Sequence, residues 1–383
     1  SASSKTVTNF EELVSAVDAM ASVKGGGTVY VNAKTIDCTS QLALKSTKGN
    51  PVKIVGVQQG DGTYPSLDFT SFRNSTIGSA GPSLKVSTDS NVGVRISGSY
   101  YTLENLIIER AGDNGIQIKG ANANYNTVNN CIVRYNNDAG VQITGGASYN
   151  TMRFVYSYRN CDVYTLGGNA DGFAPKLGAQ TGNTFYGCYA WENSDDGWDS
   201  FDYPSSKQNF NPNRWTYKNV YENCICWGNG SAPLQLGYTD YVNGKTLDEN
   251  LPVIRRIKAL VSSDVYNSFV NDYNNGNLGS RTMSSSTYLS TLDSKLSVSI
   301  PSSKGTFSIT NYCSSSNWGG NPNGFKLGSA YTQSISERTL VNCISFDHTS
   351  AGFDKNNAKC NVELKKENHY PKFKTPNGET PEE

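Results

Sequence analysis

Apolar and polar residues alternate in short stretches along this chain, and one arrangement of them recurs. An apolar residue or a cysteine is followed nine residues later by a glycine, which has Asp, Asn or Ala before it and a large apolar residue after it. The complete copies run from Leu106 to Gly115, Cys131 to Gly140, Cys188 to Gly197 and Cys343 to Gly352. Asp171-Gly172-Phe173 and Asn323-Gly324-Phe325 repeat the second half alone. Self-similarity of this kind is typical of a repeat architecture.

The spacing of the glycines indicates the kind of repeat. It is 25 residues from Gly115 to Gly140 and from Gly172 to Gly197, but 32 from Gly140 to Gly172, where we expect a longer loop. A unit this short, with brief strands and turns rich in Asn, Gly and Ser, fits one coil of a parallel β-solenoid. Helical repeats would need longer amphipathic runs, which residues 125–130 lack. We therefore predict an all-β fold, a right-handed parallel β-helix.

Stacking of the coils would place equivalent residues above one another, roughly 4.8 Å apart. One such column should point inward and hold Leu106, Cys131, Cys188, Cys224 and Cys343. Most of the central cysteines are then small buried apolar residues. The chain has nine cysteines, an odd number, so at least one thiol is free. The pair Cys224 and Cys226 is one residue too close for a C-x-x-C redox or zinc motif.

Two further features are predicted outside the repeats, one before them and one that interrupts them. An amphipathic stretch from Asn9 to about Met20 has acids in its first turn and a helix-capping asparagine, so we expect a helix that caps the open end of the solenoid. The repeat disappears from about residue 230 to 320. Because this stretch lacks a dense apolar pattern, we interpret it as a large insertion in one coil of a single domain covering residues 1–383, with one short helix from Leu251 to Val261.

Composition narrows the range of functions. The 383 residues include 33 basic and 33 acidic side chains, so no net positive charge argues for a nucleic-acid partner. No apolar run is long enough to span a membrane. The chain has only two histidines, His348 and His369, and this scarcity argues against a multi-histidine metal site and against Ser-His or Cys-His catalysis.

Acidic residues gather on two consecutive coils. The register places Asp171 over Asp196, and Asp195 and Asp199 should share the same rim if the chain bends at Gly197. Four carboxylates this close stay ionised only around a cation. Oxygen ligands without His or Cys select a hard ion, and an irregular carboxylate set favours Ca²⁺ over Mg²⁺. The alternative is a ladder of Asx-turns, because Asp and Asn are common at solenoid bends.

The column two residues after the bend glycines adds a basic residue to this site. It contains Gln117, Gln142, Ala174, Asp199, Lys326 and Asp354. Lys326 should therefore lie one coil from Asp199 if the insertion belongs to the intervening coil. Lysine shifts its pKa readily when desolvated or beside a positive ion, and Lys326 is our candidate proton acceptor. The alternative is a surface lysine that pairs with Asp199.

Four ordered segments resemble the pectate lyases of polysaccharide lyase family nine. They are residues 169–176 (NADGFAPK), 191–202 (WENSDDGWDSFD), 323–328 (NGFKLG) and 352–357 (GFDKNN). The resemblance implies a right-handed parallel β-helix with a calcium site formed by Asp171, Asp195, Asp196 and Asp199. It also implies that Lys326 is the Brønsted base.

On this basis we expect a secreted, periplasmic or cell-surface, monomeric, calcium-dependent lyase that cleaves polygalacturonate by β-elimination. Lys176, in the coil of Asp171, would hold a neighbouring substrate carboxylate or serve as a plain surface residue. One alternative is a rhamnogalacturonan lyase with the same chemistry. A second is a pectic hydrolase that uses Asp195 and Asp196 with water, for which Arg256-Ile257-Lys258 resembles a polygalacturonase tripeptide. A third is a solenoid that binds polysaccharide without catalysis.

Overall fold

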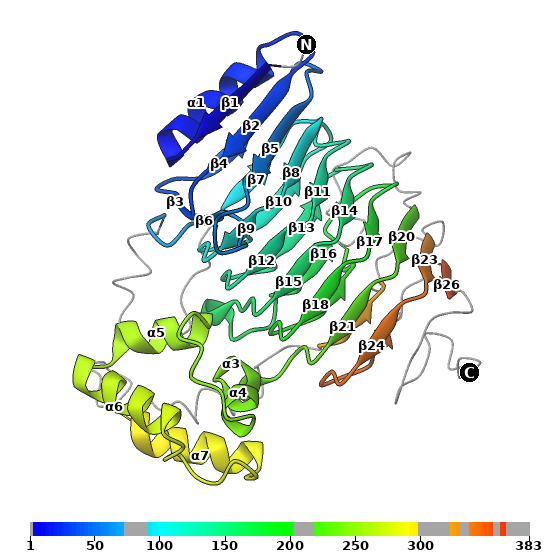
Figure 1. Cartoon of the computed structure of the whole chain (residues 1–383). Coiled ribbons are helices and arrows are strands. Elements are labelled where there is room, and N and C mark those ends of the chain that lie inside the picture. The colour runs from blue at the N-terminus through cyan, green and yellow to red at the C-terminus, as the bar shows by residue number, and fades with distance from the viewer. Residues whose placement is uncertain are drawn as a thin grey trace, which may run out of the picture.

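Each repeat of the sequence folds into short strands that join three parallel sheets running the length of a stack (Figure 1). The computed structural model describes residues 3–72, 91–202, 218–297, 322–328, 337–354 and 361–364. Every strand pair in the three sheets is parallel and joins consecutive coils. The predicted parallel β-helix is confirmed.

The three sheets take their strands in turn from each coil. Sheet A contains β1 (Ser3–Val7), β2 (Gly27–Val31), β5 (Val52–Gly56), β8 (Tyr101–Glu104), β11 (Thr127–Asn129), β14 (Thr151–Arg153), β17 (Thr184–Tyr186), β20 (Lys218–Glu222), β23 (Glu337–Val341) and β26 (Asn361–Leu364). Sheet B contains β3 (Thr35–Asp37), β6 (Ser66–Asp68), β9 (Ile107–Glu109), β12 (Ile132–Arg134), β15 (Tyr156–Tyr158), β18 (Tyr189–Trp191), β21 (Ile225–Trp227) and β24 (Ile344–Phe346). Sheet C contains β4 (Leu42–Leu44), β7 (Val94–Ile96), β10 (Ile116–Lys119), β13 (Val141–Thr144), β16 (Phe173–Pro175), β19 (Trp198–Asp199), β22 (Phe325–Lys326) and β25 (Phe353–Asp354).

The interior of the stack is filled by the columns that the repeat predicts. The inward column of one leucine and four cysteines is buried, as predicted, and Val155 occupies the rung between Cys131 and Cys188. Trp198 is also interior, with its ring stacked 4.7 Å from Phe173 and 4.6 Å from Phe325. The seven cysteines in the described part of the chain are buried free thiols. Cys313 and Cys360 lie outside the described residues.

The bend glycines are required by close approach of neighbouring coils. A Cβ added to Gly172 would lie 2.6 Å from the Cβ of Ala190, and one on Gly197 would lie 2.6 Å from the carbonyl oxygen of Gly324. Both distances are well below van der Waals contact. Only glycine therefore lets consecutive coils stack at these bends, which fixes the register of the residues on either side.

The N-terminal end is closed by α1 (Phe10–Ala21), as predicted. The side chain of Asn9 caps this helix by accepting a hydrogen bond from the backbone N–H of Glu12 at 2.9 Å. Leu13, Val17 and Met20 point into the same core as the coils. The helix thus covers apolar surface that an open solenoid end would expose.

Buried asparagines at one turn form a ladder of hydrogen bonds that is not among the features predicted above. Asn136, Asn160, Asn193 and Asn229 occupy the same position in successive coils, and each side chain from Asn160 on accepts a hydrogen bond from the backbone N–H of the previous member. His348 ends the ladder, with Nδ1 3.3 Å from the N–H of Asn229. Burial lowers the pKa of His348 to about 3, so this histidine is a neutral structural residue. His369 lies outside the described residues.

The predicted insertion leaves the stack between β21 and β22 and contains more helix than expected. Its helices are α3 (Ala232–Gln235), α4 (Tyr238–Val242), α5 (Pro252–Leu260), α6 (Ser263–Asn274) and α7 (Ser285–Leu296). Only α5 was predicted. The expectation of a sparse apolar pattern was wrong, because these helices bury a second hydrophobic cluster around Tyr241, Tyr273 and Tyr288. No helix in the described part of the chain is long and apolar enough to cross a membrane.

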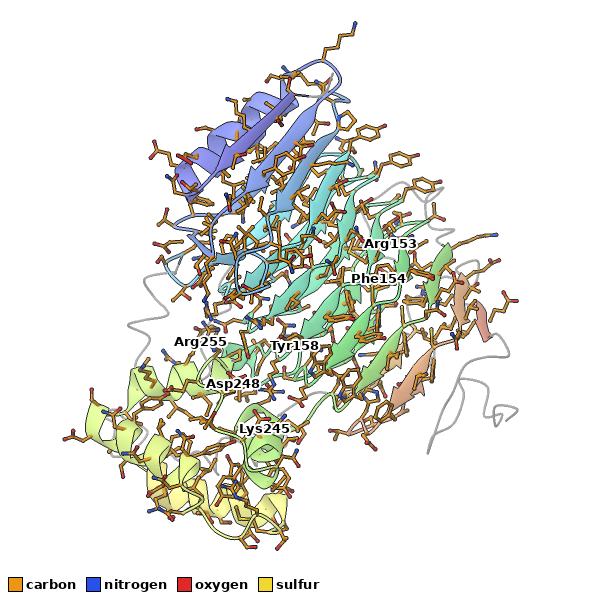
Figure 2. The ribbon with its side chains drawn as sticks, in the orientation of Figure 1. Arg153, Phe154, Tyr158, Lys245, Asp248 and Arg255 are labelled. Carbon is orange, nitrogen blue, oxygen red and sulfur yellow. The ribbon has the colours of Figure 1, made fainter. Side chains whose placement is uncertain are left out.

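The insertion is fixed to the coils by ion pairs and hydrogen bonds. Arg159, which follows β15, contacts Asp248 at 2.5 Å and Asp240 at 3.1 Å, both in the insertion. Tyr135 donates a hydrogen bond to Asp248 at 2.6 Å, and its carbonyl oxygen accepts one from Arg255 at 2.6 Å. Figure 2 shows Asp248 and Arg255 at this junction. The helices therefore lie beside the ends of the sheet B strands (Figure 1).

Candidate metal centre and adjacent lysines

The structure brings all four predicted aspartates together at the start of two consecutive strands of sheet C. Asp171 precedes the bend glycine before β16, Asp195 and Asp196 precede the equivalent glycine before β19, and Asp199 lies in β19. One carboxylate oxygen from each of the four lies within 4.8 Å of the others. The register that the repeat predicts, with Asp171 one coil before Asp196, is confirmed by the pairing of Phe173 with Trp198.

Hydrogen bonds to the backbone orient three of the carboxylates. Oδ1 of Asp171 accepts the N–H of Asp196 at 3.0 Å, Oδ1 of Asp196 accepts the N–H of Asn323 at 2.6 Å, and Oδ1 of Asp199 accepts the N–H of Phe201 at 2.9 Å. Asp171 and Asp196 therefore each tie their coil to the next one through one oxygen, whereas Asp199 bonds within its own coil. The second oxygens of Asp171 and Asp199 contact the ammonium group of Lys176, and that of Asp196 has no hydrogen-bond partner among the described residues.

The cluster is almost fully inaccessible to solvent, and its electrostatics reflect this. Burial, followed by repulsion from the neighbouring carboxylates, raises the pKa of Asp195 and Asp196 well above the usual range. Burial also raises the pKa of Asp171, to about 6, although Lys176 opposes the shift. Ionised carboxylates in this position need a positive partner.

The donor set fits a hard cation. Oδ1 of Asp195 and Oδ2 of Asp196 are buried and have no hydrogen-bond partner within the described ranges. A buried carboxylate oxygen without a partner is costly, and a metal ion among these oxygens would remove that cost. All the donors are carboxylate oxygens, which are the ligands that Ca²⁺ prefers.

Lys326 lies on the rung next to Asp199, as the sequence predicts. The two residues are register partners in β22 and β19, so the insertion falls within the intervening coil. Nζ of Lys326 is 3.9 Å from Oδ2 of Asp196 and 3.9 Å from Oδ1 of Asp199. Burial lowers the pKa of Lys326, but the surrounding carboxylates, Asp199 first, outweigh this and raise it. Its side chain is 13% exposed, so Lys326 is not a plain surface lysine.

Lys176 lies closer to the carboxylates than a plain surface lysine would. Its Nζ lies 3.0 Å from Oδ2 of Asp171 and 3.1 Å from Oδ2 of Asp199. Burial lowers the pKa of Lys176, but Asp171 and Asp199 raise it by more, so the net pKa is well above the usual range. This ammonium group is an internal partner for two of the four carboxylates.

One residue important for the geometry was missed. Asp162 is buried and accepts hydrogen bonds from the backbone N–H groups of Asn169 and Ala170, the latter at 2.8 Å. It thereby holds the segment that leads into Asp171. Burial raises the pKa of Asp162 to about 6. The signal in the sequence was the long spacing from Gly140 to Gly172, because Asp162 belongs to the extra loop.

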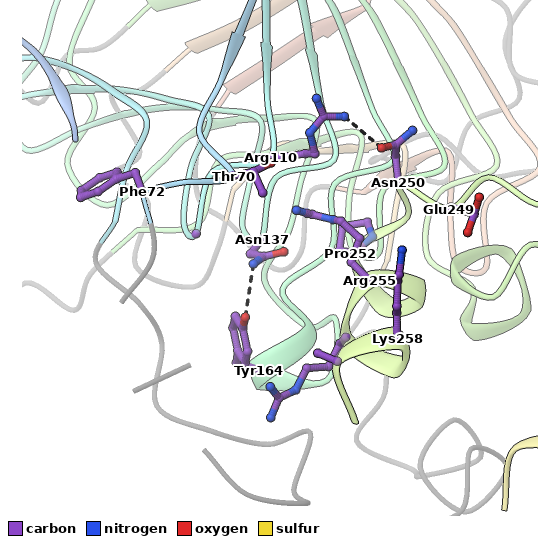
Figure 3. A pocket seen from close by; sticks show the side chains of 13 residues that line it. Thr70, Phe72, Arg110, Asn137, Tyr164, Glu249, Asn250, Pro252, Arg255 and Lys258 are labelled. Carbon is purple, nitrogen blue, oxygen red and sulfur yellow. Dashed lines mark hydrogen bonds between the residues drawn. The ribbon is translucent and has the colours of Figure 1, made fainter. Parts of the chain in front are cut away.

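A cavity of about 540 Å³ lies elsewhere, between α5 and the turns that follow the sheet B strands (Figure 3). Arg110, Arg255, Arg256 and Lys258 line it, and none of the four aspartates does. The tripeptide Arg256-Ile257-Lys258 therefore belongs to this junction, apart from the carboxylate cluster. Arg110 is held by Asp68 and Glu109, so part of the basic lining has a structural role.

Comparison with known proteins relates the chain to pectate lyases. It is similar to a pectate lyase L of Dickeya chrysanthemi, with 35% identity over 127 residues, which are 33% of this chain and 29% of that protein. It is also similar to a pectate lyase L of Dickeya dadantii (strain 3937), with 33% identity over 143 residues, 37% of this chain and 32% of that protein. The matches span about a third of the length of these curated relatives.

A solved structure supports the fold. The crystal structure of pectate lyase Pel9A aligns with 95% of this chain and 68% of its own, with a TM-score of 0.56 and 23% identity. The family model described as "Pel9A-like, right handed beta helix region" matches residues 2–246. The chain therefore belongs to the family of Pel9A-like right-handed β-helix proteins.

Proposed function

We propose that this protein is a calcium-dependent polysaccharide lyase that cleaves polygalacturonate by β-elimination. One observation carries the proposal: the amine of Lys326 lies 3.9 Å from oxygens of Asp196 and Asp199, in a cluster of four buried carboxylates, two of which have oxygens without hydrogen-bond partners among the described residues. A base beside a cation site is the arrangement needed to remove a proton next to a carboxylate. Membership of the Pel9A-like family and the similarity to pectate lyases support the same chemistry.

Asp171, Asp195, Asp196 and Asp199 would hold the ion. Bound Ca²⁺ would supply Lewis acidity, withdrawing charge from the carboxylate of a uronate residue and making its C5 proton more acidic. Backbone hydrogen bonds fix the side chains of Asp171, Asp196 and Asp199 without the ion. These side chains would therefore lose little further conformational freedom when the ion binds.

Lys326 would act as the base in its neutral form. Its amine takes the C5 proton, the C–H electron pair forms the C4–C5 double bond, and the C4–O bond breaks. The departing sugar oxygen takes a proton from solvent, and the other product has a 4,5-unsaturated uronate at its new end. Because a cation would offset the carboxylates that raise the pKa of Lys326, burial would then favour the neutral amine. Activity should rise toward alkaline pH.

Lys176 would contribute by binding substrate. When a divalent cation neutralises Asp171 and Asp199, the ammonium group of Lys176 loses its strongest partners and is available for a neighbouring uronate carboxylate. Because pectic polymers lie outside the cytoplasm, we place the site of action there as well.

The test is a digestion panel with and without calcium. Polygalacturonate, rhamnogalacturonan and a neutral glucan are incubated with the protein, and unsaturated ends and new reducing ends are counted separately. We expect calcium-dependent unsaturated ends from polygalacturonate. Unsaturated ends from rhamnogalacturonan alone would mean that rhamnogalacturonan is the substrate and that it is still cleaved by β-elimination. Reducing ends without unsaturation would indicate a hydrolase, and tight binding without turnover of any polymer would indicate a binding solenoid.

A further inference from the structure

The outer face of sheet C continues past the carboxylate cluster as a straight column of side chains. Beginning at Asp199 in β19, the residues at the same register position on successive rungs are Ala174 in β16, Gln142 in β13, Gln117 in β10 and Arg95 in β7. The residues on either side in these strands, such as Val94 and Ile96 or Ile116 and Ile118, are buried in the core. Because side chains alternate along a strand, the column points away from the core, as Asp199 does.

Two neighbouring members of this column contain buried polar atoms without partners. Nε of Arg95 and Oε1 of Gln117 are both buried and form no hydrogen bond with the part of the chain that the structure describes. The amide nitrogen of Gln117 is occupied, since it donates to Oε1 of Gln142 at 2.7 Å. Arg95 and Gln117 are register partners, so the unused donor and the unused acceptor lie on adjacent rungs. Buried polar groups are normally paired, and a ligand that accepts from one and donates to the other would satisfy both.

Arg95 differs from three arginines that lie in or directly after strands of sheet B. Arg110 pairs with Asp68, Arg134 with Glu109 and Arg159 with Glu192, each at 2.8 Å or less. Within the described ranges, no carboxylate lies within ion-pair distance of Arg95. A guanidinium group without an ion-pair partner among the described residues is suited to bind a carboxylate from outside, often through two hydrogen bonds.

We propose that Arg95 and Gln117 form an additional subsite for an acidic sugar residue of the bound polymer. Arg95 is four rungs from Asp199, which corresponds to about 19 Å along the stack. The subsite binds a uronate carboxylate at Arg95 and a sugar hydroxyl at Oε1 of Gln117. It is reached only by a chain several residues long, and it favours acidic over neutral polymers. This inference rests on the proposed function, because it assumes that the polymer passes the carboxylate cluster.

The test compares oligogalacturonates of two lengths. For the wild type, Arg95→Gln and Arg95→Lys, kcat/KM is measured on a trimer and on an oligomer of about ten residues. In Arg95→Gln we expect the ratio of kcat/KM for the long over the short substrate to fall about tenfold, the size of one lost charge-assisted hydrogen bond. Arg95→Lys should recover part of that loss. The matched control is Arg153→Gln, an exposed arginine on sheet A. An unchanged ratio in a folded Arg95→Gln protein would overturn the proposal.

A second measurement separates this inference from the proposed reaction. Binding of the long oligomer is followed by calorimetry in the Lys326→Ala background with calcium, where turnover should be absent, and in the Lys326→Ala, Arg95→Gln double variant. Weaker binding in the double variant supports the subsite even if the wild type shows no lyase activity. Equal binding by the two proteins would overturn the proposed subsite even if the wild type is an active lyase. Melting temperatures identify any variant that fails to fold, and Gln117→Leu then replaces Arg95→Gln in both comparisons.

Discussion

Nζ of Lys176 lies 3.1 Å from Oδ2 of Asp199 and 3.0 Å from Oδ2 of Asp171, with only 12% of the lysine side chain exposed. The ammonium group therefore occupies the edge of the same carboxylate cluster that we propose as a calcium site. It reduces the repulsion among the carboxylates when no other cation is bound. Lys176 and a divalent ion should compete for Asp171 and Asp199.

This competition makes a prediction for Lys176→Met. The metal-free protein should melt at a lower temperature, because the buried carboxylates lose their internal cation. Calcium should bind roughly tenfold more tightly, because the ion no longer displaces an ammonium group. Calorimetric titration and thermal denaturation measure both effects. The control is Lys119→Met, an exposed lysine at the end of β10. Calcium affinity equal to that of the wild type would show that Lys176 and the ion do not share ligands.

The pKa directions predict how stability depends on pH without metal. Burial raises the pKa of Asp171 and of Asp162 from 3.8 to about 6, and Asp195 and Asp196 shift in the same direction. The folded state then binds protons more tightly than the unfolded chain, so its stability falls as the pH rises from about 4 to about 6. Each carboxyl group contributes up to about 1.4 kcal/mol per pH unit in that window.

The measurement is a series of melting temperatures between pH 4 and pH 7, with chelator and with excess calcium. We expect the melting temperature to fall with pH in chelator and the stabilisation by calcium to grow over the same range, because the ion binds deprotonated carboxylates. A melting temperature that rises through this pH window in chelator would contradict the raised pKa values of these buried carboxyl groups.

The asparagine ladder predicts a large effect on stability from one buried side chain, that of Asn193. Asn193 is fully buried, accepts from the N–H of Asn160 at 3.2 Å and donates to Oδ1 of Asn229 at 3.0 Å. Asn193→Ala would leave a buried N–H unsatisfied, and we expect a loss of about 2–3 kcal/mol in the free energy of unfolding. Denaturant unfolding measures it. Asn271→Ala, at an exposed site on α6, should cost less than about 0.5 kcal/mol. Similar costs for both variants would mean that the ladder does not stabilise the stack.

Attachment of the insertion can be tested at Arg159. This side chain contacts Glu192 at 2.7 Å as well as the two insertion aspartates, Asp240 and Asp248. Arg159→Ala would leave these carboxylates together without their cation, so hydrogen exchange in α3–α7 should become about tenfold faster or more. Arg153→Ala, on a different sheet, is the control. Unchanged exchange would show that the helices are held by their own cluster alone.

The sequence predicted the parts of the fold that the repeat determines. Bend glycines such as Gly172 and Gly197 reveal the register, and the register is sufficient to bring Asp171, Asp196 and Lys326 to neighbouring rungs. The asparagine ladder follows the same rule, since Asn136, Asn193 and Asn229 each stand five residues after an inward cysteine, and it was detectable in principle.

Features outside the repeat were not predictable in this way. The contact between Lys176 and the aspartates depends on how a long side chain folds back over β16, which spacing does not encode. Asp162 acts from a loop that occurs in one coil only. The insertion buries tyrosines such as Tyr241 and Tyr273 together with isolated aliphatic residues from five separate helices and their connections, so no repeating apolar pattern marks its core in the sequence.

The most direct test of the proposed function is the product formed from polygalacturonate by the wild type and by Lys326→Ala, each with calcium and with chelator. We predict unsaturated uronate ends from the wild type with calcium and none with chelator. Lys326→Ala should keep its stabilisation by calcium but form product at least about 100-fold more slowly. Lys119→Ala, on the same sheet, should behave as the wild type does. Full activity in Lys326→Ala, or product formation by the wild type in chelator, would contradict the account.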